Sequence, residues 1–184
     1  MDYSKAVAVI LIGLTLACGG GKDAQSAPEK TSVAGKNGTS AADLPDPCKL
    51  VTDQEISDLL WQGMEKGQVD AMRARDAKHV ITSRVENVEM PAGRTCYFQH
   101  KRVAHDTVWS EGDFKLRTLA RPTFDMFAES SPSKQQPIAG VGDQAFYMSN
   151  AAYGRRGNVG IEVVEFGSKD VEVELLKKAV ARLP

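Results

Sequence analysis

The chain has 184 residues, of which 23 are Lys or Arg and 24 are Asp or Glu, so its formal net charge is -1. This balance excludes a strongly basic protein that binds nucleic acid, and it gives no electrostatic attraction to acidic membranes. The length is that of one domain with additional segments. We find no catalytic signature and no cofactor motif, so the sequence predicts a protein that is not an enzyme and that has no cofactor.

The first element is an apolar segment from Ala6 to Ala17. It is shorter than the about 20 residues of a membrane-spanning helix and has the length of a signal-peptide apolar region. The junction "LTLAC" ends at Cys18 and resembles the lipobox of bacterial lipoproteins, although Leu16 stands where a smaller residue is commoner. In that family signal peptidase II cuts before the cysteine, whose thiol receives a diacylglycerol. We expect a signal peptide over 1–17 and lipidation of Cys18. The alternatives are cleavage after Ala17 by the general signal peptidase and an apolar segment that is retained as an anchor.

The lipobox resemblance implies a protein of the cell envelope that is anchored to a membrane through the lipid on Cys18. Stable anchoring takes at least two acyl chains, which a diacylglycerol supplies. In Gram-negative bacteria an aspartate after the cysteine typically retains such proteins in the inner membrane, and Gly19 stands there instead. We therefore expect the outer membrane, facing the periplasm, in a Gram-negative cell, and the outer face of the cell membrane in a Gram-positive one.

Residues 18–45 are expected to form the lipidated cysteine and a flexible linker. Gly, Ser, Ala and charged residues dominate this segment, so it buries too little surface to offset the entropy of ordering it. Cys48 and Cys96 remain, and two cysteines in an oxidising compartment most simply form one disulfide. A reactive thiol pair and metal binding by the two cysteines are the alternatives, although the sequence has no Cys-x-x-Cys motif.

A single domain is expected over 46–184. Thr52 and Glu55 have the spacing of a capping box, and apolar residues follow from Ile56 at helical intervals, so the domain opens with a helix. Residues 67–80 fit either a second helix or a loop.

Strands are expected next, at 81–90 and 94–101. Alternation places Cys96 and Phe98 on one face of the second strand and Tyr97 and Gln99 on the other.

The following segment reads as a tight hairpin with its turn at Glu111-Gly112. In its second strand Phe114 shares a face with Leu116 and Thr118. The charged residues between them, Lys115 and Arg117, are expected to point to solvent.

The last third starts with a short helix, for which Thr123 is the expected cap, and a loop. Three antiparallel strands follow at 144–148, 151–156 and 158–166, with Gly157-Asn158 as the second turn. Ser168 is the expected cap of a closing helix. The order helix, strands, short helix, strands, helix predicts an α+β domain in which an antiparallel sheet is covered by helices and carries one disulfide.

Three segments, "PCKLVTDQEISDLL", "TCYF" and "GVGDQAFY", resemble in their order a family of small bacterial lipoproteins that is abundant in actinobacteria and whose shared domain has no known function. The resemblance covers about residues 46 to 166. It implies the disulfide between Cys48 and Cys96 and a location in the envelope, and it implies no activity.

Two further patterns are candidates for chemistry. The segment from Gly140 to Ala145 has the letters of a dinucleotide fingerprint, but a strand is expected after it where that fingerprint needs a helix. We interpret it as a glycine turn in which Asp143 binds backbone amides. The three histidines, His79, His100 and His105, are expected on the solvated surface, with a metal site as the alternative.

The sequence leaves three functions open. The first is a non-enzymatic envelope lipoprotein that binds another envelope protein or acts in assembly, which an exposed sheet face would favour. The second is a carrier or sensor for a small hydrophobic or anionic ligand, which a pocket lined by Trp61, Met64 or Phe127 would favour. The third is a hydrolase without a recognisable motif, which a Ser/His/Asp cluster or a pair of carboxylates in a cleft would favour.

Overall fold

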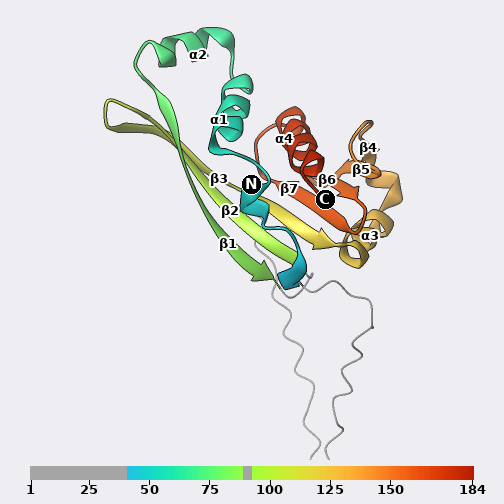
Figure 1. Cartoon of the computed structure of the whole chain (residues 1–184). Coiled ribbons are helices and arrows are strands. Elements are labelled where there is room, and N and C mark those ends of the chain that lie inside the picture. Colours follow the sequence, from blue (N-terminus) through green and yellow to red (C-terminus); the bar gives the residue numbers. More distant parts are fainter. Residues whose placement is uncertain (1–40, 89–92) are drawn as a thin grey trace, which may run out of the picture. The chain divides into compact units, whose positions relative to one another are not determined.

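The computed structural model describes residues 41–88 and 93–184. The predicted signal peptide, Cys18 and the linker up to residue 40 lie outside the described residues. Seven strands form one sheet in the order β1-β2-β3-β7-β6-β5-β4, and every neighbouring pair is antiparallel (Figure 1). The strands are β1 (Lys78–Val88), β2 (Gly93–Ala104), β3 (Thr107–Ala120), β4 (Gln136–Pro137), β5 (Gln144–Met148), β6 (Ala151–Arg156) and β7 (Val159–Val164).

Helices lie on both faces of this sheet, as Figure 1 shows. Helices α1 and α4 pack on one face, and α3 packs on the opposite face near β7. The α-helices are α1 (Asp53–Gln62), α2 (Lys66–Arg73), α3 (Arg121–Ser130) and α4 (Lys169–Ala181), and the short 3-10 helices are η1 (Ala41–Asp43), η2 (Pro47–Lys49) and η3 (Pro132–Lys134). Among the described residues, none of the helices has the length and apolarity needed to cross a membrane. The predicted α+β class, with an antiparallel sheet covered by helices, is confirmed.

The start of α1 follows from its first residues. The Thr52 side chain accepts a hydrogen bond from the backbone of Glu55, and the Glu55 carboxylate accepts one from the backbone N–H of Thr52 at 2.9 Å. This capping box, which the spacing predicts, satisfies two amide groups at the helix end. The segment 67–80, which fitted a helix or a loop, divides into α2 and the beginning of β1.

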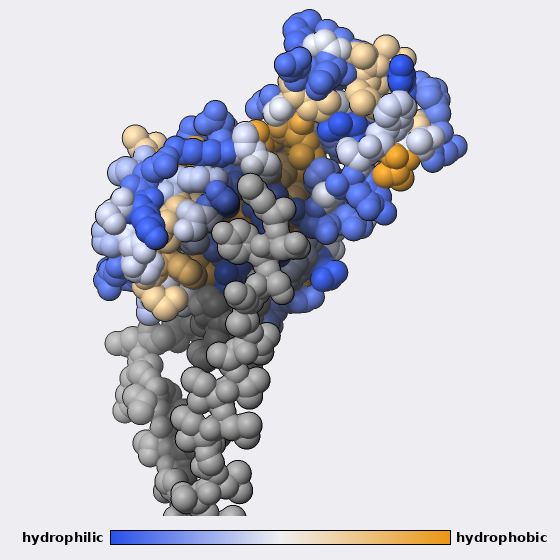
Figure 2. Space-filling model, turned by 180° about the vertical axis from the view of Figure 1, so that it is seen from behind, coloured by the Kyte–Doolittle hydropathy of each residue, from blue (hydrophilic) through white to orange (hydrophobic). Residues whose placement is uncertain are grey.

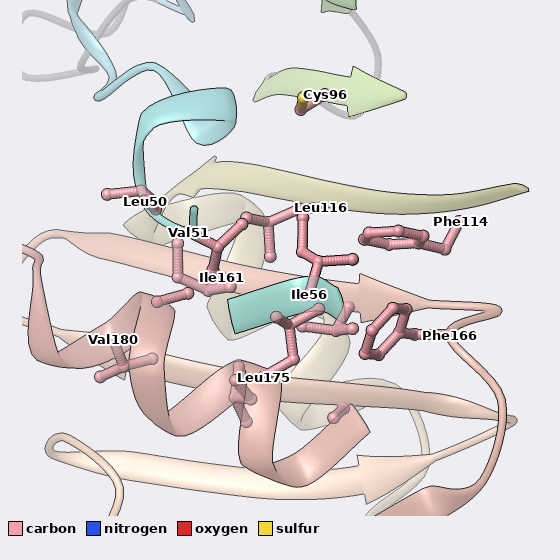
Figure 3. Packing of buried hydrophobic residues seen from close by; sticks show 14 of the residues in the cluster. Leu50, Val51, Ile56, Cys96, Phe114, Leu116, Ile161, Phe166, Leu175 and Val180 are labelled. Carbon is pink, nitrogen blue, oxygen red and sulfur yellow. The ribbon is translucent and has the colours of Figure 1, made fainter. Parts of the chain in front are cut away.

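The main core lies between the sheet and the helices α1 and α4. Figure 3 shows Ile56 of α1 lying between the sheet residues Leu116 and Ile161 and the α4 residue Leu175. All four side chains are fully buried. Phe98 and Phe114 stack with their ring centroids 4.6 Å apart and continue this core along the sheet. A second, smaller cluster on the opposite face joins α3 to β5 and β6.

A disulfide joins η2 to β2, because Cys48 and Cys96 are bonded to each other. The chain before it also packs on the sheet: Leu44 is only 2% exposed. Arg94 Nη1 donates to the Leu44 carbonyl at 2.9 Å, and Thr118 Oγ1 donates to the Pro45 carbonyl at 2.9 Å. The prediction that the linker runs to residue 45 is therefore too long at its C-terminal end, because residues 41–45 belong to the folded unit.

The predicted hairpin turn at Glu111-Gly112 is wrong. Strand β3 runs unbroken through both residues, and the turn that joins it to β2 is formed by His105 and Asp106. These two residues have positive φ angles of 47° and 62°, as a two-residue turn with the twist of a hairpin requires. Gly112 faces His100 of β2, and an added Cβ would lie 2.8 Å from His100 Nε2. The absence of a side chain at Gly112 therefore makes room for the His100 ring.

Two details near α3 also differ from the predictions. Phe114, Leu116 and Thr118 share the buried face as expected, but Arg117 does not point to solvent, since its side chain is 16% exposed and pairs with Glu162. Thr123 is not the cap of α3. The helix begins at Arg121 with a proline in its first turn, and the fixed φ of proline suits that place.

The three strands predicted in the last third are β5, β6 and β7, although β7 ends at Val164, and the predicted loop before them contains η3 and β4. The turn between β6 and β7 is at Gly157-Asn158, and Ser168 occupies the N-cap position of α4 without a side-chain hydrogen bond there.

Candidate binding surfaces on the arm

Strands β1, β2 and β3 extend beyond the rest of the sheet. Strand β3 pairs with β7 only from Lys115 to Ala120, so the preceding part of β3 has β2 as its neighbour on one side alone. We call residues 78–84, 97–104 and 107–115 the arm; Figure 1 shows it projecting from the remainder of the folded unit, with α2 near its end. Among the described residues the outer edge of β1 has no neighbouring strand.

One face of the arm is polar, and we call it the open face. The register aligns Arg84 with Tyr97 and Tyr97 with Lys115, and two residues along each strand it aligns Thr82 with Gln99 and Gln99 with Asp113. Residues two apart on a strand share a face, so these six side chains form two adjacent rows. With Glu165 they line a hollow of about 380 Å³.

Contacts along the open face hold its long side chains in place. The Arg84 guanidinium lies 4.9 Å from the centre of the Tyr97 ring, and Lys115 Nζ lies 3.0 Å from a Glu165 carboxylate oxygen. Farther along the sheet the same face is covered by α3, but no described helix packs on it over the arm. Within the described residues, the open face is thus a partly aromatic surface without a covering helix, and its long side chains are held by these contacts.

The opposite face of the arm carries a cluster around Trp61 of α1. The His79 ring centroid lies 4.5 Å from that of Trp61, and His100 contacts His79 edge to face at 6.2 Å. The Arg102 guanidinium lies 5.3 Å from the Trp61 ring centre. His79 and His100 are half-buried, so the expectation that they lie on the solvated surface is wrong for both. Trp61 of α1 packs against His79, and His79 packs against His100. His105, in the hairpin turn, is exposed as expected.

Ser57 and His79 form the arrangement nearest to catalytic chemistry, since Ser57 Oγ lies 3.2 Å from His79 Nδ1. Arg102 Nε, which can only donate, lies 3.3 Å from His79 Nε2. Nε2 is therefore the acceptor and Nδ1 carries the proton of the neutral ring, so His79 donates to Ser57. Burial and the Arg102 and His100 charges lower the pKa of His79 to about 4. A weakly basic ring that donates to the serine does not activate it, and this pair does not fit a Ser-His-Asp triad.

The other candidate residues have structural positions. Gly140 and Gly142 have positive φ angles of 74° and 55°, and a Cβ on Gly142 would overlap with the Arg155 carbonyl oxygen, so the segment is the predicted glycine turn. Asp143 Oδ2 accepts a hydrogen bond from the backbone of Gly157 at 2.8 Å. Among the described residues, no cluster of three His, Cys, Asp or Glu side chains could hold a metal ion.

Two buried carboxylates were not found by sequence reasoning. Glu162 is 5% exposed and accepts hydrogen bonds from Tyr153 Oη at 2.9 Å and Arg117 Nη1 at 2.6 Å. Glu172 is 1% exposed, accepts from the backbone N–H of Phe166 at 3.0 Å, and has a pKa raised by burial. The alternation along β7 predicts that Glu162 is exposed, and the apolar stripe of α4 predicts the same for Glu172. Their burial therefore follows from tertiary contacts and not from the local sequence.

Comparison of the chain with protein-family models, with curated proteins and with solved structures gave no match.

Proposed function

We propose that this protein is a membrane-anchored lipoprotein of the cell envelope whose folded unit binds another envelope protein without catalysing a reaction. The observation that carries the proposal is the open face of the arm. This face of the sheet contains a hollow of about 380 Å³, in which Arg84 stacks on Tyr97. Arg and Tyr are residue types that concentrate binding energy in protein interfaces.

The anchoring half of the proposal rests on the cysteines and the leader. The sequence has 3 cysteines, and Cys48 and Cys96 are bonded to each other. Cys18 is then the remaining cysteine, and it follows directly after the apolar segment that ends at Ala17. A disulfide also suits the oxidising compartment outside the cytoplasm.

The binding half is supported by the edge of the sheet and by exposed apolar side chains. Strand β1 is an edge strand of 11 residues, and a long open edge is a site at which an extended segment of a partner adds a strand. Val80 of β1, which is 43% exposed, shares the face of Thr82 and Arg84, and Val108 and Trp109 at the arm end are 49% and 47% exposed. In Figure 2 apolar surface gathers where the arm joins the remainder of the unit, while most of the visible surface is hydrophilic.

We therefore assign the partner an extended segment that pairs with β1 and places side chains over the open face. Backbone hydrogen bonds to the strand edge would supply affinity, and the rows of Arg84 and Thr82 would supply specificity.

Site-specific photocrosslinking in intact cells tests this assignment. A photoreactive phenylalanine analogue replaces Tyr97 on the open face, and in a control protein it replaces Glu174, an exposed residue of α4. We expect a discrete protein adduct from the first position and none from the second.

Two substitutions test whether the adduct depends on the open face. Val80→Asp should weaken the adduct, whereas Met126→Asp should not, because Met126 is 52% exposed on α3, away from the arm. An adduct that forms equally from both crosslinker positions, or whose yield is unchanged by Val80→Asp, contradicts the proposed interface.

A further inference from the structure

A second hollow lies on the other side of the arm, between α2 and β2. Its volume is about 350 Å³, and it is lined by Met64, Gln68, Ala71, Met72, Arg75 and Arg102. Gln68, Ala71 and Met72 have the i, i+3, i+4 spacing that places side chains on one face of a helix. Met64 precedes α2, and Arg75 follows it. The volume is at the lower end of the roughly 300–1,000 Å³ range of small-molecule sites.

The hollow combines an apolar wall with two cationic groups. The Arg75 guanidinium lies 5.3 Å from the Trp109 ring centre, and the Arg102 guanidinium lies 5.3 Å from the Trp61 ring centre. Within the described part of the chain neither arginine forms an ion pair with a carboxylate, in contrast to Arg84 on the open face, which lies 3.0 Å from Glu86. Two guanidinium groups held by aromatic rings at the edge of an apolar wall are complementary to an anion that carries an apolar chain.

Helix α2 has no buried side chains, although burial of an apolar face is what normally stabilises a short helix. It has eight residues, and isolated helices of such length are unstable in water. Its apolar side chains Val69 and Met72 are only half-buried. An apolar chain in the hollow would cover Met72 and Met64, and methionine adapts readily to such contacts.

We propose that this hollow binds one molecule of a free fatty acid. The carboxylate accepts hydrogen bonds from the guanidinium groups of Arg75 and Arg102, and the alkyl chain lies along Met64, Ala71 and Met72. A single alkyl chain fits the volume of about 350 Å³. The site lies on the face of the arm opposite to the open face.

Dodecanoate titrated into the purified folded protein tests the proposal, at concentrations at which dodecanoate alone forms no micelles. The 2 tryptophans of the chain are those against which Arg75 and Arg102 stack, so their fluorescence reports binding, and calorimetry gives the affinity and stoichiometry. We expect saturable binding of one dodecanoate per chain, and binding of the uncharged dodecanol that is at least tenfold weaker.

Two variants locate the site. Arg75→Gln, at an exposed position where folding should be unaffected, should weaken dodecanoate binding about tenfold or more, because it removes a charge-assisted hydrogen bond. Arg121→Gln, at an exposed position of α3, is the matched control and should leave the affinity unchanged. Absence of saturable binding, equal binding of dodecanol, or equal effects of the two substitutions would overturn the proposal.

Discussion

Removal of the disulfide should destabilise the folded unit by about 4 kcal/mol. The bridge closes a sequence separation of 48 residues, and the loss of loop-closure entropy from an unfolded chain crosslinked at that distance amounts to about 4 kcal/mol at 25 °C. The structure adds a local reason. The bridge fastens η2 to β2, and the buried residues Leu44, Leu50 and Val51 lie on the segment that it holds.

The assay is urea unfolding of the oxidised protein and of the double variant Cys48→Ala/Cys96→Ala, followed by tryptophan fluorescence and circular dichroism. We expect the loss of about 4 kcal/mol to appear as a lower midpoint, with a larger dependence on urea because the uncrosslinked unfolded chain is more expanded. The melting temperature should fall by roughly 10–15 °C. A loss below about 1 kcal/mol would refute the reasoning, because the unfolded state would then not be constrained by the bridge.

Two further predictions concern charges in the structure. Arg117→Met leaves the Glu162 carboxylate buried without its cation and should lower the free energy of unfolding by about 3–5 kcal/mol. Lys115→Met, in the more exposed pair with Glu165, should lower it by less than about 1 kcal/mol. Equal losses for the two variants in denaturant unfolding would contradict this prediction. Hydrogen bonds from Arg182 lower the pKa of Glu55 from 4.5 to about 2, so its contribution to stability is present above pH 4.5 and is lost as the pH falls toward 2. Glu55→Gln should flatten that part of the stability curve in unfolding at pH 5 and pH 3, and an unchanged slope would disprove the assignment.

Local signals predicted much of the fold because they depend on neighbours in the sequence. The capping box at Thr52, the turn at Gly157-Asn158 and the glycine turn before β5 follow from residue spacing and backbone preference. The turn at Glu111-Gly112 failed for a physical reason. Glycine there makes room for His100 on the next strand, and the turn uses His105 and Asp106, which are less characteristic of positive φ than glycine.

The candidate site depends on contacts that the sequence does not contain. The rows of the open face arise from the register of three strands, and Tyr97 meets Arg84 and Lys115 only through that register. The burial of His79 depends on α1 folding back over the arm, which strand alternation alone does not indicate. The sequence named Trp61, Met64 and Phe127 as possible pocket residues. Met64 lines the hollow beside α2, whereas Phe127 packs against the second core cluster.

The central claim is that the folded unit is held at a membrane through Cys18 and acts there by binding. The most direct test is the intact mass of the protein extracted gently from its own membranes, measured first under native and then under denaturing conditions. The denatured mass should equal that of the chain from Cys18 plus its acyl groups, less the two hydrogen atoms lost in the disulfide, and the native mass should exceed it by a non-covalently bound molecule. A chain that carries no acyl group and whose native mass shows no excess would contradict the account.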